Sequence, residues 1–279
     1  MLIGIGLIAE LVQSIMLTGR VQNADEGKPK PLSLLLIAPP ESGKTSVVLA
    51  NKSKLALDYT DITGMAILEE IQKHPEMTHL IINDLGIVGG HRASVQKYTM
   101  GVICALVEEG LTRTAFPGGA GHSFTEPRKG GVIASVPSKL ANDGRAWWVR
   151  TGLASRMLPF NYSHSKALRL KIRTHIEKGD SKKKPTKKTK VLEPEVAYPE
   201  KNIRVHVGPA MAHEIRKIAD ARGESLGEYG YRRGKQYRIL CQGHALYRGD
   251  WKNAHVTERD VEFLALVDPY VSYTKAKEI

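Results

Sequence analysis

The chain has 279 residues, 42% of them hydrophobic and 25% charged, and its formal net charge is +12. This composition is that of an ordinary soluble protein, and the length allows one or two folded domains. The chain has only two cysteines, in stretches with helical spacing, so we expect buried thiols in a reducing compartment and neither a disulfide nor a zinc site.

The first 17 residues form an apolar segment that could be mistaken for a membrane span. The segment is too short to cross a bilayer, contains Glu10 and Gln13, and lacks the basic start and the cleavage site of a signal peptide. We therefore predict a mostly buried helix beside the core, no membrane partner and a cytoplasmic protein.

Residues 38–45 read Ala-Pro-Pro-Glu-Ser-Gly-Lys-Thr and separate an apolar run, typical of a buried parallel strand, from a helical stretch. This order is typical of a P-loop, in which backbone N–H groups and the helix N-terminus hold a nucleotide phosphate, with Ala38 at a position that usually holds Gly. Lys44 would contact the β- and γ-phosphates, and Thr45 would hold Mg²⁺. The predicted nucleotide contacts are Pro40, Glu41, Ser42, Gly43, Lys44, Thr45 and Ser46. The ligand is ATP or GTP, and the absence of an Asn-Lys-x-Asp element favours ATP.

Strands and helices are predicted to alternate after this loop. We predict strands over 55–59, 79–82 and 131–135, and helices over 64–73 and 94–109. Glycines at 86, 89 and 90 predict a flexible loop, and 111–126 a hairpin or loop. The pattern indicates an α/β fold, with a parallel sheet sandwiched by helices, over residues 1–165.

A basic segment follows. Residues 166–190 carry +9 of the net charge of +12, and we predict that residues 166–202 are a flexible linker. Such a run attracts the phosphates of nucleic acid, although a linker that only aids solubility has the same composition. The predicted nucleic-acid contacts in the run are Lys182, Lys183, Lys184, Lys187 and Lys188.

The C-terminal part, residues 203–279, is predicted to be a small all-helical module. Residues 207–222 and 231–248 have helical apolar spacing. Thr257 and Asp260 form a capping box that opens a last helix over 258–267.

The ordered set of these features resembles an AAA+ ATPase, in particular the clade of minichromosome-maintenance helicases and MoxR-type ATPases. Residues 152–157 (Gly-Leu-Ala-Ser-Arg-Met) resemble the stretch that carries the arginine finger, and residues 233–261 resemble the helical lid. Plasmid- and phage-encoded ATPases of uncharacterised role share this appearance.

The resemblance implies roles for individual residues. Asp84 would end the Walker B strand and hold Mg²⁺ or its water, but Leu85 stands where the family has a catalytic Glu, so Glu108 or Glu109 would have to act as the base. Ser135 or Ser138 would be the polar sensor on the third strand. Arg156 would reach the nucleotide of the next subunit in a ring or filament. Arg233 or Arg238 would contact phosphate from the lid.

Further positions have two interpretations each. Trp147 and Trp148 either pack at a subunit interface or stack on bases. The basic residues His91, Arg92, Arg113, Arg128 and Lys129 either line a pore that follows a phosphate backbone or are solvated loop charges. The sequence thus predicts an oligomeric ATPase that acts on DNA (or RNA). The alternatives are a MoxR-type chaperone with an acidic protein partner, and an ATP-binding scaffold with little turnover.

Overall fold

The computed structural model describes residues 5–22, 28–114, 121–143, 152–179, 198–226, 230–249 and 251–279. The expected nucleic-acid contacts between Lys182 and Lys188 and the pair Trp147 and Trp148 lie outside these residues. In the described part, no helix is both long and apolar enough to cross a membrane.

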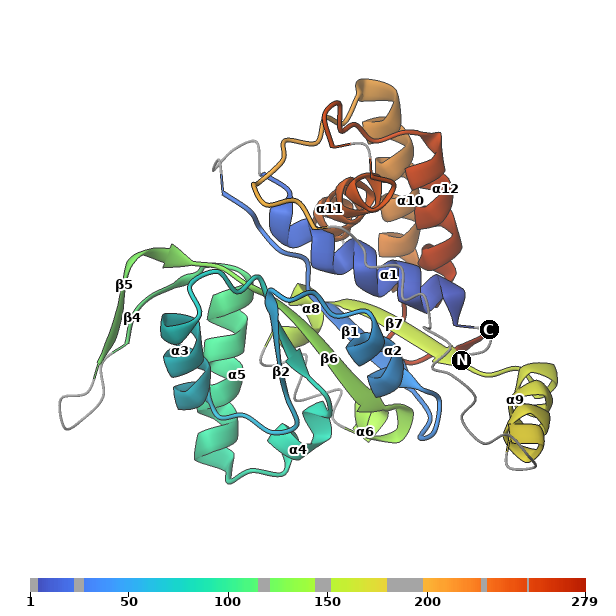
Figure 1. Ribbon diagram of the computed structural model, residues 1–279, viewed down its shortest axis with the longest axis horizontal. Helices are drawn as coiled ribbons and strands as arrows, with labels where there is room; N and C mark the ends of the chain where they lie inside the picture. Colours follow the sequence, from blue (N-terminus) through green and yellow to red (C-terminus); the bar gives the residue numbers. More distant parts are fainter. Residues whose placement is uncertain are drawn as a thin grey trace, which may run out of the picture.

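A six-stranded sheet forms the centre of the molecule, with the strand order β2-β3-β6-β1-β7-β8, and all neighbouring strands are parallel (Figure 1). The strands are β1 (Leu34–Ala38), β2 (Ala56–Tyr59), β3 (His79–Ile82), β6 (Gly131–Pro137), β7 (Leu158–Ser163) and β8 (Lys277–Glu278). We call the side where the strands begin the amino edge and the side where they end the carboxyl edge. The predicted α/β fold with a parallel sheet is confirmed.

Helices cover both faces of the sheet because alternate side chains of its apolar strands point in opposite directions. Leu35 and Ile37 of β1 face a cluster with α3 (Gly64–Lys73) and α5 (Ala93–Val107). Leu34 and Leu36 face a cluster with α1 (Gly6–Leu17) and α2 (Lys44–Ala50). The N-terminal apolar segment is therefore a buried helix, as its composition predicted.

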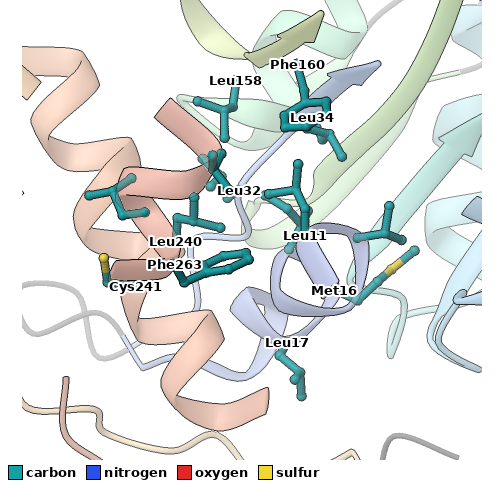
Figure 2. Packing of buried hydrophobic residues seen from close by; sticks show 14 of the residues in the cluster. Leu11, Met16, Leu17, Leu32, Leu34, Leu158, Phe160, Leu240, Cys241 and Phe263 are labelled. Carbon is teal, nitrogen blue, oxygen red and sulfur yellow. The ribbon is translucent and has the colours of Figure 1, made fainter. Parts of the chain in front are cut away.

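The C-terminal helices pack on α1, which separates them from the sheet (Figure 1). They are α10 (Pro209–Leu226), α11 (Tyr231–Tyr247) and α12 (Glu258–Val267). Leu11 of α1 lies between the sheet and the residues Leu240 and Phe263 of this module (Figure 2). One hydrophobic cluster thus joins the helical module to one face of the sheet through α1.

Several predicted elements have the predicted bounds. Strand β3 and helices α3 and α12 agree with the sequence prediction, and Thr257 and Asp260 form the predicted capping box. Strands β4 (Leu111–Thr114) and β5 (His122–Arg128) form an antiparallel hairpin.

Other segments differ from the prediction. The first part of the predicted linker is helix α9 (Lys166–Gly179), which projects from the end of β7 (Figure 1). The glycine-rich segment after Asp84 is the short helix α4 (Leu85–Gly89) and not a loop, because the Asp84 side chain accepts a hydrogen bond from the N–H of Gly86 at 2.8 Å. The remaining short elements are η1 (Thr18–Arg20), α6 (Ser138–Asp143), α8 (Leu153–Arg156) and η2 (Asp268–Tyr270).

Candidate nucleotide-binding site

The loop between β1 and α2 has an unusual backbone. Glu41 has a φ of 61° and Gly43 a φ of 79°, and Glu41 is the only non-glycine residue with positive φ in the described ranges. A side chain in this conformation costs energy and persists only where the surrounding structure requires it. Left-handed residues in a loop at a helix N-terminus turn backbone N–H groups toward one side, which is the geometry of an anion-binding nest.

Lys44 lies within this loop. Its ammonium group donates hydrogen bonds to the carbonyl oxygens of Ala38 and Pro39, both at 2.8 Å, and to the hydroxyl of Ser42 at 3.3 Å. Burial lowers the pKa of Lys44, and the nearby carboxylate of Asp84 opposes this shift. The structure therefore brings the cation of the loop near the acidic residue that follows β3.

The strand order explains this proximity. Strand β6 lies between β1 and β3, so the loop after β1, the end of β6 and Asp84 all lie on the carboxyl edge. Ser135 of β6 donates a hydrogen bond to the carbonyl of Asn83, which ties these two strand ends together. Ligands of open parallel sheets bind at this edge, where the chain connections diverge to opposite sides.

The same edge contains polar atoms without partners. The atoms Asn83 Oδ1, Ser138 Oγ, Asn161 Oδ1 and His164 Nε2 are buried and have no hydrogen-bond partner in the described part of the chain. Buried polar groups are nearly always paired, so these atoms suit a polar ligand such as a nucleotide phosphate with its hydrated metal ion.

Strand β7 supports the loop from the other side. The hydroxyl of Tyr162 donates to the carbonyl of Ser42 at 3.2 Å. Burial raises the pKa of Tyr162 to about 12, and its hydrogen bond to Ser42 opposes the shift, so the phenol stays a donor at neutral pH. Sequence reasoning missed β7 with its site residues Asn161 and Tyr162, and it missed His164, which follows the strand. The alternating apolar residues of 158–162 were a signal, but Pro159 argues against an interior strand because it lacks an N–H.

The predicted magnesium ligands fit an ion of this kind. Thr45 is exposed at the start of α2, and Asp84 uses Oδ1 to cap α4, which leaves Oδ2 without a partner among the described residues. The described residues contain no group of three or more His, Cys, Asp or Glu suited to a metal. Mg²⁺ bound by one hydroxyl, one carboxylate, phosphate and water needs no such group.

The position after Asp84 cannot supply a catalytic base. Leu85 is only 3% exposed and packs in the hydrophobic cluster under α5. The carboxylates proposed in its place, Glu108 and Glu109, follow α5, whose end is hydrogen-bonded to the segment just before β6 at the amino edge. The four residue steps of β1 alone separate the two edges by about 13 Å. The prediction that Glu109 acts as base at the P-loop of its own chain is therefore wrong.

Arg156 also lies at the amino edge. Its Nε is 2.6 Å from Glu108 Oε2 and its Nη2 is 3.4 Å from Glu109 Oε1. This position excludes contact with the P-loop of the same chain, and the contact with a neighbouring subunit stays a prediction.

The predicted lid arginines do not reach the P-loop. Arg233 is 2% exposed and donates to Gln236 Oε1 at 2.7 Å, and the preceding Arg232 binds Glu108 at 2.7 Å. This end of α11 therefore lies beside α8 at the amino edge. Arg238 is exposed on the same helix. The predicted contact of Arg233 or Arg238 with phosphate in cis is wrong for this arrangement, because Arg232 and Gly243, which flank both residues in α11, lie against Glu108 and Thr18 at the amino edge.

The two predicted nucleic-acid contacts that lie in the described ranges do not form one patch. Arg92 and Arg113 are both exposed, but they lie beyond opposite ends of α5, which has 15 residues and is about 22 Å long. Arg128 turns inward and donates to the carbonyl of Met77.

Helix α9 lies in the segment that the sequence predicted to be a linker, and its outer face is basic. Leu168 is buried, whereas Lys166, Arg169 and Arg173 share the opposite helical face with Leu170, which is 65% exposed.

No protein-family model matches the chain, and a search of curated proteins finds no significant match.

Proposed function

We propose that the chain is a P-loop ATPase of the AAA+ type that binds Mg²⁺–ATP, assembles through Arg156 and acts on DNA. One observation carries the nucleotide assignment. The loop after β1 has a nest-like backbone, surrounds the ammonium of Lys44 and faces Asp84 across one intervening strand. This combination suits a triphosphate with its metal ion.

ATP would occupy the carboxyl edge, with its phosphates against residues 40–46. Lys44 would leave the carbonyls of Ala38 and Pro39 to bind phosphate oxygens, and Thr45 with Asp84 would hold Mg²⁺. The metal ion supplies charge neutralisation at the β- and γ-phosphates. Ser135 and Asn83 lie where they could orient the attacking water.

The proposed assembly is based on the positions of the two edges. The P-loop and Arg156 lie on opposite edges of the sheet. The Arg156 guanidinium would therefore contact nucleotide phosphates only in a second copy of the chain. A contact between unlike edges generates a ring or a filament.

DNA is the proposed substrate because of the basic outer face of α9. This helix begins three residues after β7 ends, and β7 supports the P-loop, so a phosphate backbone on α9 would lie near the nucleotide site. The buried Leu85 favours a second candidate, an ATP-switched scaffold with little turnover, because no carboxylate follows Asp84.

The test is the steady-state ATPase rate with and without single- and double-stranded DNA at low salt. The variant Lys44→Ala is the inactive control. We expect DNA to raise the rate of the wild type. Replacing Arg169 and Arg173 by Gln should weaken DNA binding and reduce the slope of log affinity against log salt by about 1 to 2. Replacing the exposed Arg216 and Lys217 of α10 by Gln removes the same charge. This control should change neither the DNA affinity nor its dependence on salt. Bound ATP without turnover in any condition would support the scaffold instead.

A further inference from the structure

A cavity lies at the amino edge, on the opposite edge of the sheet from the P-loop. Its volume is about 670 Å³, and it lies among η1, the start of β3 and the turn after β5. This volume is in the range of pockets that hold ligands of nucleotide size.

The apolar residues that line the cavity are mostly prolines. They are Pro29, Pro31, Pro75, Met77 and Pro127. Because the proline ring fixes φ, this part of the lining has little freedom to collapse, and a flat apolar group could bind to a surface already formed.

The rest of the lining carries more positive than negative charge. The cations are Arg20, Lys28, Arg128 and Lys129, and the carboxylates are Glu76 and Glu109. Both carboxylates also contact side chains outside the lining: Glu109 is 3.4 Å from the Arg156 guanidinium and Glu76 is 3.5 Å from the His74 ring. Lys28 is paired with Glu126.

Two arginines of this lining have unused donors. The Nε atoms of Arg20 and Arg128 are buried and have no hydrogen-bond partner within the described ranges. Burial lowers the pKa of the Arg128 guanidinium, and Glu76 opposes the shift. Desolvation of a guanidinium is unfavourable, and the charge of an anion in the cavity beside the two arginines would offset part of that cost.

We propose that this cavity binds the phosphate ester of a nucleotide-sized molecule, with the phosphate beside Arg20 and Arg128 and the apolar part against the prolines of the lining. Guanidinium groups suit phosphate because their planar donors bind two oxygens at once. The phosphate ester could be a free nucleotide or the terminal phosphate of a nucleic-acid strand. The proposal is independent of nucleotide binding at the P-loop, because the two sites lie on opposite edges of the sheet.

Titration calorimetry on the full chain tests the proposal. The protein carries Lys44→Ala, so that the P-loop does not contribute. The probes are 5′-AMP, adenosine, and a thymidine dinucleotide with or without a 5′-phosphate. We expect 5′-AMP and the phosphorylated dinucleotide to bind, and each probe without the 5′-phosphate to bind at least about tenfold more weakly. The tighter of the two phosphorylated probes identifies the source of the phosphate.

Variants locate the binding. Arg20→Gln and Arg128→Gln should each weaken 5′-AMP binding about tenfold, the effect of losing one charge-assisted hydrogen bond. Arg113→Gln removes the same charge from the same hairpin as Arg128 but lies outside the lining, and it should have no effect. Arg128 also bonds the carbonyl of Met77, so Arg20→Gln is the decisive variant if Arg128→Gln unfolds the chain. Unchanged affinity of Arg20→Gln, or no binding of any phosphorylated probe at millimolar concentration, would overturn the proposal.

Discussion

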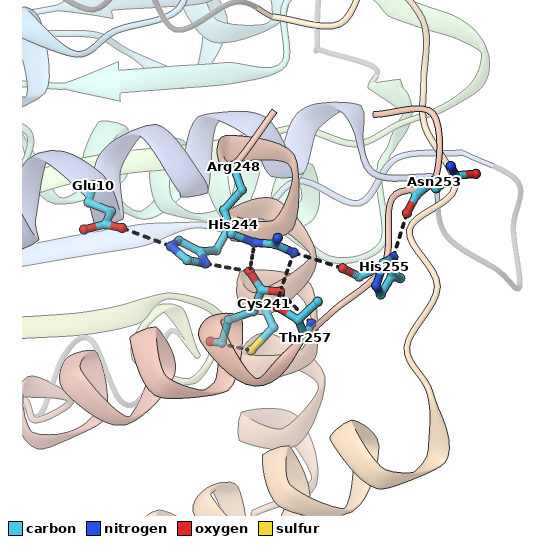
Figure 3. Close-up of polar contacts among 8 residues, drawn as sticks. Glu10, Cys241, His244, Arg248, Asn253, His255 and Thr257 are labelled. Carbon is cyan, nitrogen blue, oxygen red and sulfur yellow. Dashed lines mark hydrogen bonds and ion pairs between the residues drawn. The ribbon is translucent and has the colours of Figure 1, made fainter. Parts of the chain in front are cut away.

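Asp260 is a fully buried carboxylate that joins two helices of the C-terminal module. It accepts hydrogen bonds from His244 Nδ1 at 2.7 Å and from Arg248 Nε at 2.9 Å, and its Oδ2 caps the N–H of Thr257 at 2.7 Å. His244 also contacts Glu10 of α1 at 3.0 Å, so the network reaches from α12 through α11 to α1 (Figure 3). The capping box was predictable from local sequence, but the partners His244 and Arg248 were not, because they depend on how the helices pack.

This network predicts a pH-dependent contribution to stability. Burial raises the pKa of Asp260, but hydrogen bonds from His244, Arg248 and Thr257 outweigh burial and hold the pKa below its ordinary value. The stabilisation is therefore complete above the ordinary aspartate pKa of about 4 and is lost as the pH falls through the lower folded-state value.

Asp260→Asn should reduce the free energy of unfolding by about 3 kcal/mol near pH 7, because it leaves Arg248 with a neutral partner in a buried site. Urea unfolding from pH 7 to pH 3 measures this, and the difference from the wild type should shrink below pH 4. Glu258→Gln, which removes an exposed charge from the same helical turn, is the control and should cost less than about 0.5 kcal/mol. A difference that stayed constant down to pH 3 would show that the Asp260 charge does not stabilise the fold.

At the scale of elements, α11 approaches α1 very closely at Gly243. A Cβ atom at Gly243 would lie 2.3 Å from the carbonyl oxygen of Ser14 and 2.7 Å from Thr18 Cγ2. Since the first of these atoms belongs to the backbone, a side chain at Gly243 would force the two helices apart.

We expect Gly243→Ala to reduce the free energy of unfolding by about 2–3 kcal/mol, measured with urea. Gly234→Ala in the same helix is the matched control, because its Cβ would meet only Ala219 at 3.8 Å. That variant should instead gain about 0.5–1 kcal/mol from better helix propensity. Equal effects of the two substitutions would contradict the close approach of α1 and α11.

Elements with strong local signals were predictable. The apolar run of β3, the helical spacing of α3 and the capping box of α12 gave the observed bounds. The failures have physical causes. Pro159 concealed β7, the glycines concealed α4, and the charges of α9 obscured its buried residue Leu168.

In the candidate site, too, some residues could be placed from the sequence and others could not. The P-loop was predictable because its chemistry lies in consecutive residues. The positions of Glu109 and Arg233 were not, because the edge of the sheet that each one reaches depends on the packing of α5 and α11.

At the scale of the whole molecule, the residues of the proposed reaction lie on two opposite edges. Lys44 and Asp84 lie on the carboxyl edge, and Arg156 lies on the amino edge with Glu108 and Glu109. One chain would therefore be incomplete, and hydrolysis would require the edges of two copies to meet.

Mixing two inactive variants tests this arrangement. Lys44→Ala and Arg156→Ala should each lower turnover, the second by about 10³-fold or more while ATP binding is kept. In a mixed assembly, the intact P-loop of an Arg156→Ala subunit can meet the intact Arg156 of a Lys44→Ala subunit. The mixture should then hydrolyse ATP faster than the sum of the separate proteins. Additive rates at concentrations where the chains associate would exclude Arg156 as a group acting between subunits.

The most direct measurement is the affinity of the chain for Mg²⁺–ATP, by titration calorimetry, for the wild type, Lys44→Ala and Lys54→Ala. Lys54 is an exposed cation on the same connection between β1 and β2, so it controls for the loss of charge alone. The structure predicts binding by the wild type and by Lys54→Ala, and an affinity at least about 100-fold lower for Lys44→Ala. No binding by the wild type at millimolar ATP, or equal binding by all three proteins, would contradict a nucleotide site in the loop between β1 and α2.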